Sequence, residues 1–142
     1  MRVRRSLIAA AVWMTLAGAV PMLAHHAFSA EFDGNRPISL RGTVVKMEWV
    51  NPHSWITMAV KNENGTTETW EVEAGAPNAM FRRGFRKDSL IAGTEILIQG
   101  FRAKSGKNVA NGRDITLPDG RKLFMGSSGT GAPADGRDPT ER

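Results

Sequence analysis

Apolar and polar residues alternate along the middle of the chain, and this period of two is typical of β-strands that bury one face. From Trp55 to Lys61 every second residue is apolar, and a second alternating run extends from Thr66 to Ala74. Asn64 and Gly65 lie between the runs, and because both residues tolerate positive φ the sequence predicts a tight β-hairpin. Further strands are predicted over Leu40–Trp49, with Gly42 as a bulge or bend, Glu95–Phe101 and Val109–Leu117, the last interrupted at Asn111-Gly112.

One segment between the third and fourth predicted strands has a different character. Residues Pro77 to Arg83 predict a short helix, because proline suits the first helical turn and Gly84 can end the helix. In an OB barrel a helix occupies this place and plugs one end of the barrel. The predicted fold class is therefore all-β with one short helix, as a small five- to six-stranded OB-like barrel over residues 38–125. The rival is a β-sandwich, which usually has about seven strands.

The first 24 residues have the pattern of a targeting segment. Three arginines precede an uncharged apolar run from Leu7 to Val20, and Ala24 offers a small residue for cleavage. The run has 14 residues, fewer than the roughly 20 that span a bilayer. We therefore expect a cleavable signal peptide over residues 1–24, no permanent membrane anchor and a periplasmic location. A buried N-terminal helix is the alternative.

Two polar segments flank the predicted barrel. Residues 25–37 predict an N-terminal arm, and we expect its only large apolar side chains, Phe28 and Phe32, to pin it to the domain. Residues 126–142 are rich in Gly, Ser, Pro and Asp and lack large apolar side chains, so they predict a disordered tail.

Charge and cysteine content narrow the classes of function. The chain has 19 Lys and Arg against 14 Asp and Glu, but three of the arginines lie in residues 1–24, which leaves 16 against 14 after cleavage. A net charge of +2 gives little support to nucleic acid as a partner. The absence of cysteine excludes disulfides, thiol nucleophiles and thiolate metal sites. No nucleophile elbow, phosphate loop or metalloprotease motif is present, so we expect no enzymatic activity.

Four stretches carry a resemblance to known proteins. They are His25-His26-Ala27-Phe28 with Glu31-Phe32-Asp33, Glu48 to Trp55, Gly75 to Leu90, and Ala110-Asn111-Gly112-Arg113 through Arg121. With these stretches the chain resembles a family of small exported proteobacterial proteins of unknown function. The resemblance implies export and an OB-like fold, and it implies no activity, substrate or cofactor.

The three histidines are candidate metal ligands. If cleavage follows Ala24, the amine and imidazole of His25 can chelate one Cu²⁺, and His26 or His53 can complete a nitrogen-rich site of the kind that copper(II) favours. Copper is therefore the expected cofactor, if there is one. Met22, three residues before the cut, is larger than usual for a signal peptide, and the alternative is that the histidines are ordinary polar groups.

The loop after the first predicted strand is a candidate ligand-binding site. In an OB fold this loop flanks the ligand face, and aromatic side chains there can stack on sugars or bases. The candidate residues are Trp49, Asn51 and Trp55. The alternative is that the tryptophans only pack the barrel.

The end of the predicted helix is a candidate anion site. Four cations with two interleaved phenylalanines can bind a phosphate, a lipid head group or an acidic protein. The candidates are Arg82, Arg83 and Arg86, with Lys87 beside them. The alternative is a solvated helix end whose cations interact favourably with the helix dipole.

Together these patterns favour binding over catalysis. We expect a soluble periplasmic binding module for a metal ion or a small anionic ligand. The alternative is an accessory module that docks onto a larger envelope enzyme or transporter.

Overall fold

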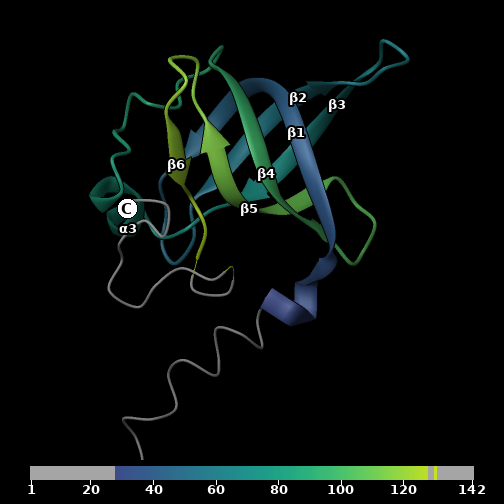
Figure 1. Ribbon diagram of the computed structural model, residues 1–142, viewed down its shortest axis with the longest axis horizontal. Coiled ribbons are helices and arrows are strands. Elements are labelled where there is room, and N and C mark those ends of the chain that lie inside the picture. Colours follow the sequence, from purple (N-terminus) through teal and green to yellow (C-terminus); the bar gives the residue numbers. More distant parts are fainter. Residues whose placement is uncertain (1–27, 128–129, 131–142) are drawn as a thin grey trace, which may run out of the picture.

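The computed structural model describes residues 28–127 and Thr130, and their backbone is mostly β-strand (Figure 1). Residues 28–31 form a short helical turn that leads into the first strand. The elements are β1 (Phe32–Glu48), β2 (Trp55–Lys61), β3 (Thr67–Glu73), α3 (Pro77–Arg82), β4 (Glu95–Ala103), β5 (Val109–Thr116) and β6 (Lys122–Phe124).

The strands form one sheet that closes on itself. Their order is β3-β2-β1-β4-β5-β6, and β3 also pairs with β5 in parallel, so β1 to β5 form a hydrogen-bonded ring. The parallel closure is short, from Glu71 opposite Val109 to Glu73 opposite Asn111. The predicted class, all-β with one short helix and strands arranged as in an OB barrel, is confirmed, although the ring is less regular than an ideal barrel. Two separate stacked sheets, as in a sandwich, are not observed among the described residues.

The core is built from the predicted alternating positions. Ile56, Met58 and Val60 of β2 are buried, as are Trp70 and Val72 of β3. The helix α3 begins at Pro77 as predicted, buries Met80 in the core, and is followed by Gly84 with φ +98°. Full burial of one such large side chain contributes about 1.5–3 kcal/mol, so this interior supplies most of the stabilising free energy.

Strand β1 is long because it serves both sides of the ring. Gly42 pairs with Val60 of β2 and with Ile96 of β4. A Cβ atom at Gly42 would lie 2.2 Å from the carbonyl oxygen of Ala59, so only glycine allows this approach of the strands. A bulge at Gly42 is not observed: the register shift lies between Val44 and Lys46, which leaves Val45, three residues later, as the extra residue.

The hairpin between β2 and β3 is confirmed, but its turn differs from the prediction. Asn62 donates its N–H to the Thr66 carbonyl at 2.8 Å, so the loop is longer than two residues. Within this turn only Gly65 has a positive φ, of 86°. Asn64 instead accepts the Thr66 N–H with its side-chain oxygen at 3.0 Å, which stabilises the turn without positive φ.

The predicted boundaries of the arm and tail need correction. Half of the predicted arm is strand, since β1 begins at Phe32. The tail cannot begin at Gly126, because Gly126 is buried and its carbonyl accepts a hydrogen bond from Arg83 Nη1 at 2.7 Å. The predicted interruption of the fifth strand is also wrong, because β5 runs through Asn111-Gly112. The predicted signal peptide and residues 128–129 and 131–142 of the predicted tail lie outside the described residues.

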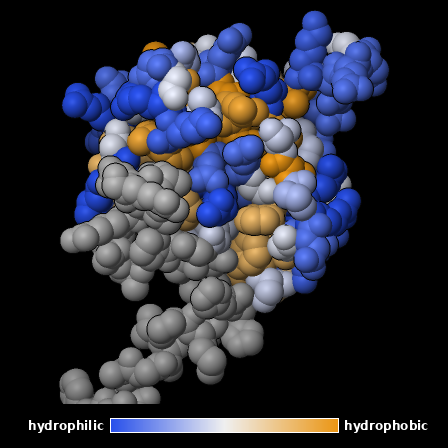
Figure 2. Space-filling view, in the orientation of Figure 1, coloured by the Kyte–Doolittle hydropathy of each residue, from blue (hydrophilic) through white to orange (hydrophobic). Residues whose placement is uncertain are grey.

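No helix within the described ranges is long and apolar enough to cross a membrane. On the face shown in Figure 2, apolar groups form patches over the strands, surrounded by hydrophilic side chains.

Candidate functional site

A histidine and a buried carboxylate meet on the outer surface of the barrel, beside the parallel closure. His53 lies in the loop before β2, and Glu73 is the last residue of β3. His53 Nδ1 is 2.7 Å from Glu73 Oε1. The His53 side chain is 38% exposed whereas that of Glu73 is only 7% exposed. The carboxylate therefore lies on the buried side of the imidazole.

The strand register explains why these two side chains meet. Glu73 pairs with Trp55, and Ser54 exchanges backbone hydrogen bonds with Ala74 and Gly75 across the same two strands. His53 therefore stands diagonally across from Glu73 on the same face of the sheet, because side chains two residues apart on a strand share a face.

Glu73 lies on the outer side of β3 but is only 5% exposed. Asn111 of β5 pairs with Glu73 and donates Nδ2 to Glu73 Oε1 at 3.4 Å. Burial raises the pKa of the Glu73 carboxyl above its ordinary value of 4.5, His53 acts to lower it, and the carboxylate of Glu31 raises it further. The glutamate is thus a partly desolvated acid that contacts His53 and Asn111.

One buried polar atom beside Glu73 has no hydrogen-bond partner among the described residues. Asn111 is 2% exposed, and its Oδ1 is unpaired although its Nδ2 donates to Glu73. Buried polar atoms are normally paired, so this acceptor is an unsatisfied group next to the His53–Glu73 pair. Ser54 Oγ is also buried and unpaired, but Ser54 adjoins His53 in the chain and therefore points to the opposite, inner face.

The end of the arm packs against β4 and the residue after it. Phe28 packs on Phe32 and Phe101 with ring centroids 5.7 Å apart in each pair, which confirms that the phenylalanines pin the arm. Lys104 donates its backbone N–H to the Glu31 carbonyl at 2.9 Å. The Glu31 carboxylate also helps to raise the pKa of Glu73, after the larger effects of burial and of His53.

The predicted metal ligands fall into two groups. His53 lies in the site, whereas His25 and His26 lie outside the described residues. Within residues 28–127 and Thr130, no three His, Asp or Glu side chains are arranged to hold a metal ion. A metal site at His53 therefore requires ligands from beyond this part of the chain.

The aromatic loop divides between core and surface. Trp49 is half-buried and packs on Phe81 of α3, with ring centroids 4.9 Å apart. Trp55 is half-buried directly opposite Glu73, and Asn51 is exposed. Of the three predicted ligand-binding residues, only Trp55 borders the His53 site through its strand pairing.

The four cations after α3 do not form one basic face. Arg82, Arg86 and Lys87 are exposed, but Arg83 is 7% exposed. The Arg83 guanidinium lies 4.8 Å from the centre of the Phe124 ring and donates to the Gly126 carbonyl. The expectation of a four-residue patch is wrong at Arg83, because its guanidinium connects the end of α3 to Phe124 of β6 and to Gly126.

Comparison with known proteins adds a family to this geometry. Residues 13–112 match the model of DUF6152, a family of unknown function. The chain belongs to this family. No curated protein and no solved structure matches the chain. The part of the chain that matches DUF6152 contains the whole His53 site, from Glu31 to Asn111.

Sequence reasoning missed Glu73, Asn111 and Glu31. Asn111 lies in a motif that carried the family resemblance, so it had a signal. Glu73 had no such signal. Glu71 occupies an equivalent outer position of the same strand and is only half-buried, so the strand pattern does not distinguish the two glutamates.

Proposed function

We propose that this protein is a periplasmic binding module that holds a late first-row transition-metal ion, copper above all, at His53. The observation that carries the proposal is the 2.7 Å contact between His53 Nδ1 and Glu73 Oε1. Histidines that bind metals commonly donate one ring N–H to a carboxylate, which fixes the tautomer and leaves the other nitrogen for the metal. The partial exposure of His53 gives Nε2, on the far side of the ring, a route to solvent.

The remaining ligands are His25 and His26. His26 lies two residues before Phe28, where the described helical turn of the arm begins. For a shared site, this short segment must fold back toward His53. If export ends with cleavage after Ala24, the amine of His25 adds a fourth nitrogen.

The choice of copper follows from the donor set. The chain has no cysteine, so thiolate sites are excluded. Imidazole nitrogens suit copper, zinc and nickel, and a set of three or four nitrogens in one plane suits copper(II) best. Glu73 contacts His53 and is not itself a ligand, and its negative charge then balances part of the positive charge of the metal ion.

The test is a Cu²⁺ titration of the protein recovered from cells, with its N-terminus established by intact mass. We expect His53→Ala to abolish the shared site and Glu73→Gln to weaken it by about 10–100-fold. One extra N-terminal residue should also weaken binding, because it removes the amine from the His25 chelate. Lys61→Gln, a charge removal at the far end of β2, is the control that should bind like the parent.

Equal affinity in the parent, His53→Ala and the extended form would overturn the proposal. Loss in the extended form alone would leave a copper site local to the terminus and would remove His53 from it.

A second candidate function, docking onto a larger envelope protein, is supported by exposed apolar side chains. Val45, Val50 and Ile91 are 52%, 48% and 60% exposed. Ile91 lies in the loop that is hydrogen-bonded to β1 through Gly93 and Val44, close to Val45. Replacing Val45 and Ile91 by Ser should abolish a partner crosslink formed in cells from this face, with Lys61→Ser as the control. An unchanged crosslink would exclude this surface.

A small anionic ligand has less support. The cleft beside Arg86 also contains Arg121, but Asp88 and Asp119 line it as well, and Asp119 is paired with Arg121 at 2.7 Å. These carboxylates cancel most of the attraction for an anion.

A further inference from the structure

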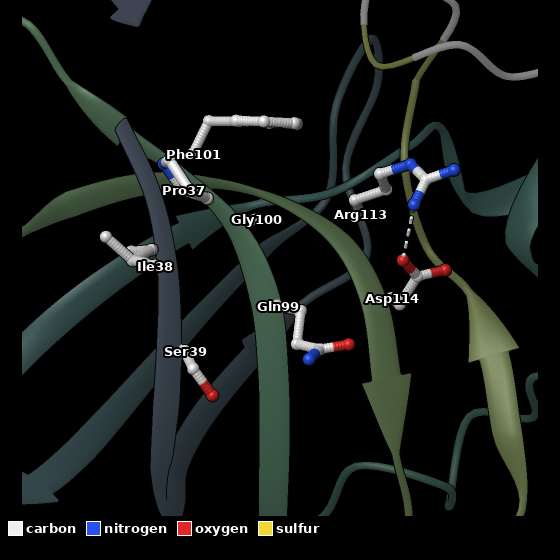
Figure 3. Close-up of a pocket in the computed structure, with 8 residues that line it drawn as sticks. All are labelled: Pro37, Ile38, Ser39, Gln99, Gly100, Phe101, Arg113 and Asp114. Carbon is white, nitrogen blue, oxygen red and sulfur yellow. Dashed lines mark hydrogen bonds and ion pairs between the residues drawn. The ribbon is translucent and has the colours of Figure 1, made fainter. Parts of the chain in front are cut away.

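A groove on the outer face of β1, β4 and β5 is separate from the His53 site. Its volume is about 400 Å³. Figure 3 shows its lining, which includes Pro37, Ser39, Gln99, Phe101, Arg113 and Asp114. Neither the predicted metal site nor the predicted ligand-binding loop includes any of these residues.

Strand register places three polar side chains in one row across this groove. Ser39 pairs with Gln99 between β1 and β4, and Gln99 pairs with Asp114 between β4 and β5. Within the described part of the chain, the side chains of Ser39 and Gln99 make no hydrogen bond. Their hydroxyl and amide groups are therefore available to a ligand, with donors and acceptors in both groups.

A bulge adds a fourth polar group to the row. Neighbouring residues on a regular strand point to opposite faces, so Arg113 and Asp114 would normally be separated. Gln99 pairs with Asp114 whereas Gly100 pairs with Gly112, which leaves Arg113 as the extra residue of the bulge. Arg113 Nη1 thus lies 3.0 Å from Asp114 Oδ2. Figure 3 shows the Gln99 amide between β4 and β5, and the Arg113–Asp114 pair across the β5 ribbon from it. Bulges commonly re-aim side chains beside functional sites.

An apolar row runs alongside the polar one. Pro37 pairs with Phe101 two residues farther along the same strands, so both share the face of Ser39 and Gln99. The Phe101 ring is half-exposed and is held by the edge of Phe28 at 5.7 Å. The groove consequently has one packed aromatic ring beside a row of side chains that contain both hydrogen-bond donors and acceptors.

We propose that this groove binds a neutral saccharide through one or two pyranose rings. A pyranose has an apolar C–H face that packs on an aromatic ring and a rim of hydroxyl groups that each donate and accept hydrogen bonds. Phe101 and Pro37 match the apolar face, and Gln99, Ser39, Arg113 and Asp114 match the rim. Carboxylate, amide and guanidinium groups are planar and can each engage two adjacent hydroxyls.

Charge argues for a neutral ligand. Arg113 and Asp114 form an ion pair, so their charges cancel inside the groove. Phosphate or nucleic acid would meet the Asp114 carboxylate, and a metal ion would meet the Arg113 guanidinium. A purely apolar ligand would desolvate the Ser39 hydroxyl and the Gln99 amide without giving them partners, which costs free energy for each of them.

The test is an amide NMR titration of the protein with maltohexaose, cellohexaose and hexa-N-acetylchitohexaose, each raised to millimolar concentration. We expect saturable shifts for at least one of these sugars, centred on Ser39, Gln99, Phe101, Arg113 and Asp114. Gln99→Ala, which removes an exposed side chain without internal hydrogen bonds, should weaken binding about tenfold. Phe101→Ala should weaken it further, and Glu95→Ala, on the same strand and face outside the groove, should bind like the parent.

The proposal is overturned if none of the three sugars gives saturable shifts, if the shifts centre elsewhere, or if Gln99→Ala binds like the parent. Because Phe101 also supports Phe28, a folding defect in Phe101→Ala leaves the decision to Gln99→Ala. The groove shares no proposed ligand with the metal site, so failure of either proposal leaves the other standing.

Discussion

At the scale of single residues, the decisive feature is a carboxylate that the barrel buries on its outer side. Glu73 is held between His53 and Asn111 at 2.7 Å and 3.4 Å. Such a group is costly when charged and unpaired, so its partner largely determines its protonation. The same geometry that orients the imidazole makes the stability of the protein depend on pH.

Glu73→Gln tests this dependence. The pKa of Glu73 is raised in the folded state, so its contribution to stability is fully present below 4.5, the ordinary value, and is lost as the pH rises through the folded-state pKa. Gln removes that loss. We expect the free energy of unfolding of Glu73→Gln, relative to the parent, to increase between acid and neutral pH, as measured by urea denaturation across that range. A difference that stays constant with pH would show that Glu73 titrates normally.

Arg83 is a second residue whose role follows from burial. Arg83→Leu removes the donor to the Gly126 carbonyl and leaves that buried acceptor unsatisfied. We expect a loss of about 1–3 kcal/mol in the free energy of unfolding. The exposed neighbour provides the control, since Arg82→Leu should change stability by less than about 0.5 kcal/mol. Similar effects of both changes would mean that the Arg83 contacts contribute little.

At the scale of elements, the ring depends on strands that approach very closely at glycines. Gly42 lies where β1 passes from β4 to β2, and Gly100 lies where β4 meets the bulge of β5. A Cβ atom at Gly100 would lie 2.1 Å from the Asn111 carbonyl oxygen. These contacts involve backbone atoms, which cannot move away as a flexible side chain can.

Gly42→Ala is therefore expected to strain the crossover of β1. Overpacking of this kind costs about 1–3 kcal/mol, and thermal unfolding should show a clear drop in Tm. Gly34→Ala, earlier on the same strand, is the control, because its Cβ would have its nearest contact at 3.9 Å from Phe28. An unchanged Tm in Gly42→Ala would mean that β1 and β2 separate without cost.

At the scale of the whole molecule, the last described residues complete the barrel instead of trailing from it. Met125 is fully buried, donates its N–H to the Arg113 carbonyl and accepts the Gly75 N–H at 2.8 Å. The segment after β6 thus links the bulge of β5 with the connection between β3 and α3. Met125 thus contacts Arg113, which lines the groove, and Gly75, which lies two residues after Glu73 of the His53 site.

Truncation separates this segment from the rest of the tail. Removal of residues 131–142 leaves every contact described here in place and should not change the unfolding midpoint in urea. Removal of everything after Phe124 also deletes Met125 and Gly126, and we expect a loss of about 2–5 kcal/mol, as for deletion of a large buried side chain. Equal stability of the two truncated forms would place the end of the folded domain at Phe124.

The sequence by itself determined where the central hairpin and the helix lie, and roughly where the other strands lie, although not where β1 begins. Alternation in β2 and β3 reports burial directly, because side chains on a strand have a period of exactly two. Pro77 and Gly84 mark the ends of α3 through their own backbone preferences. These signals are local, and the order of the elements then limited the topology to a few choices, of which the OB-like ring was one.

Only the tertiary structure decided which polar residues are buried and which of them meet. Glu71 and Glu73 occupy equivalent outer positions of β3, yet Glu73 alone is covered, by His53 from the preceding loop and by Asn111, 38 residues farther along the chain. Arg83 is likewise buried because Phe124 and Gly126 return to it, whereas Arg82 stays in solvent. Burial of an outward-facing group depends on contacts between segments that are distant in the sequence. The local pattern of apolar and polar residues in a strand or helix does not predict those contacts.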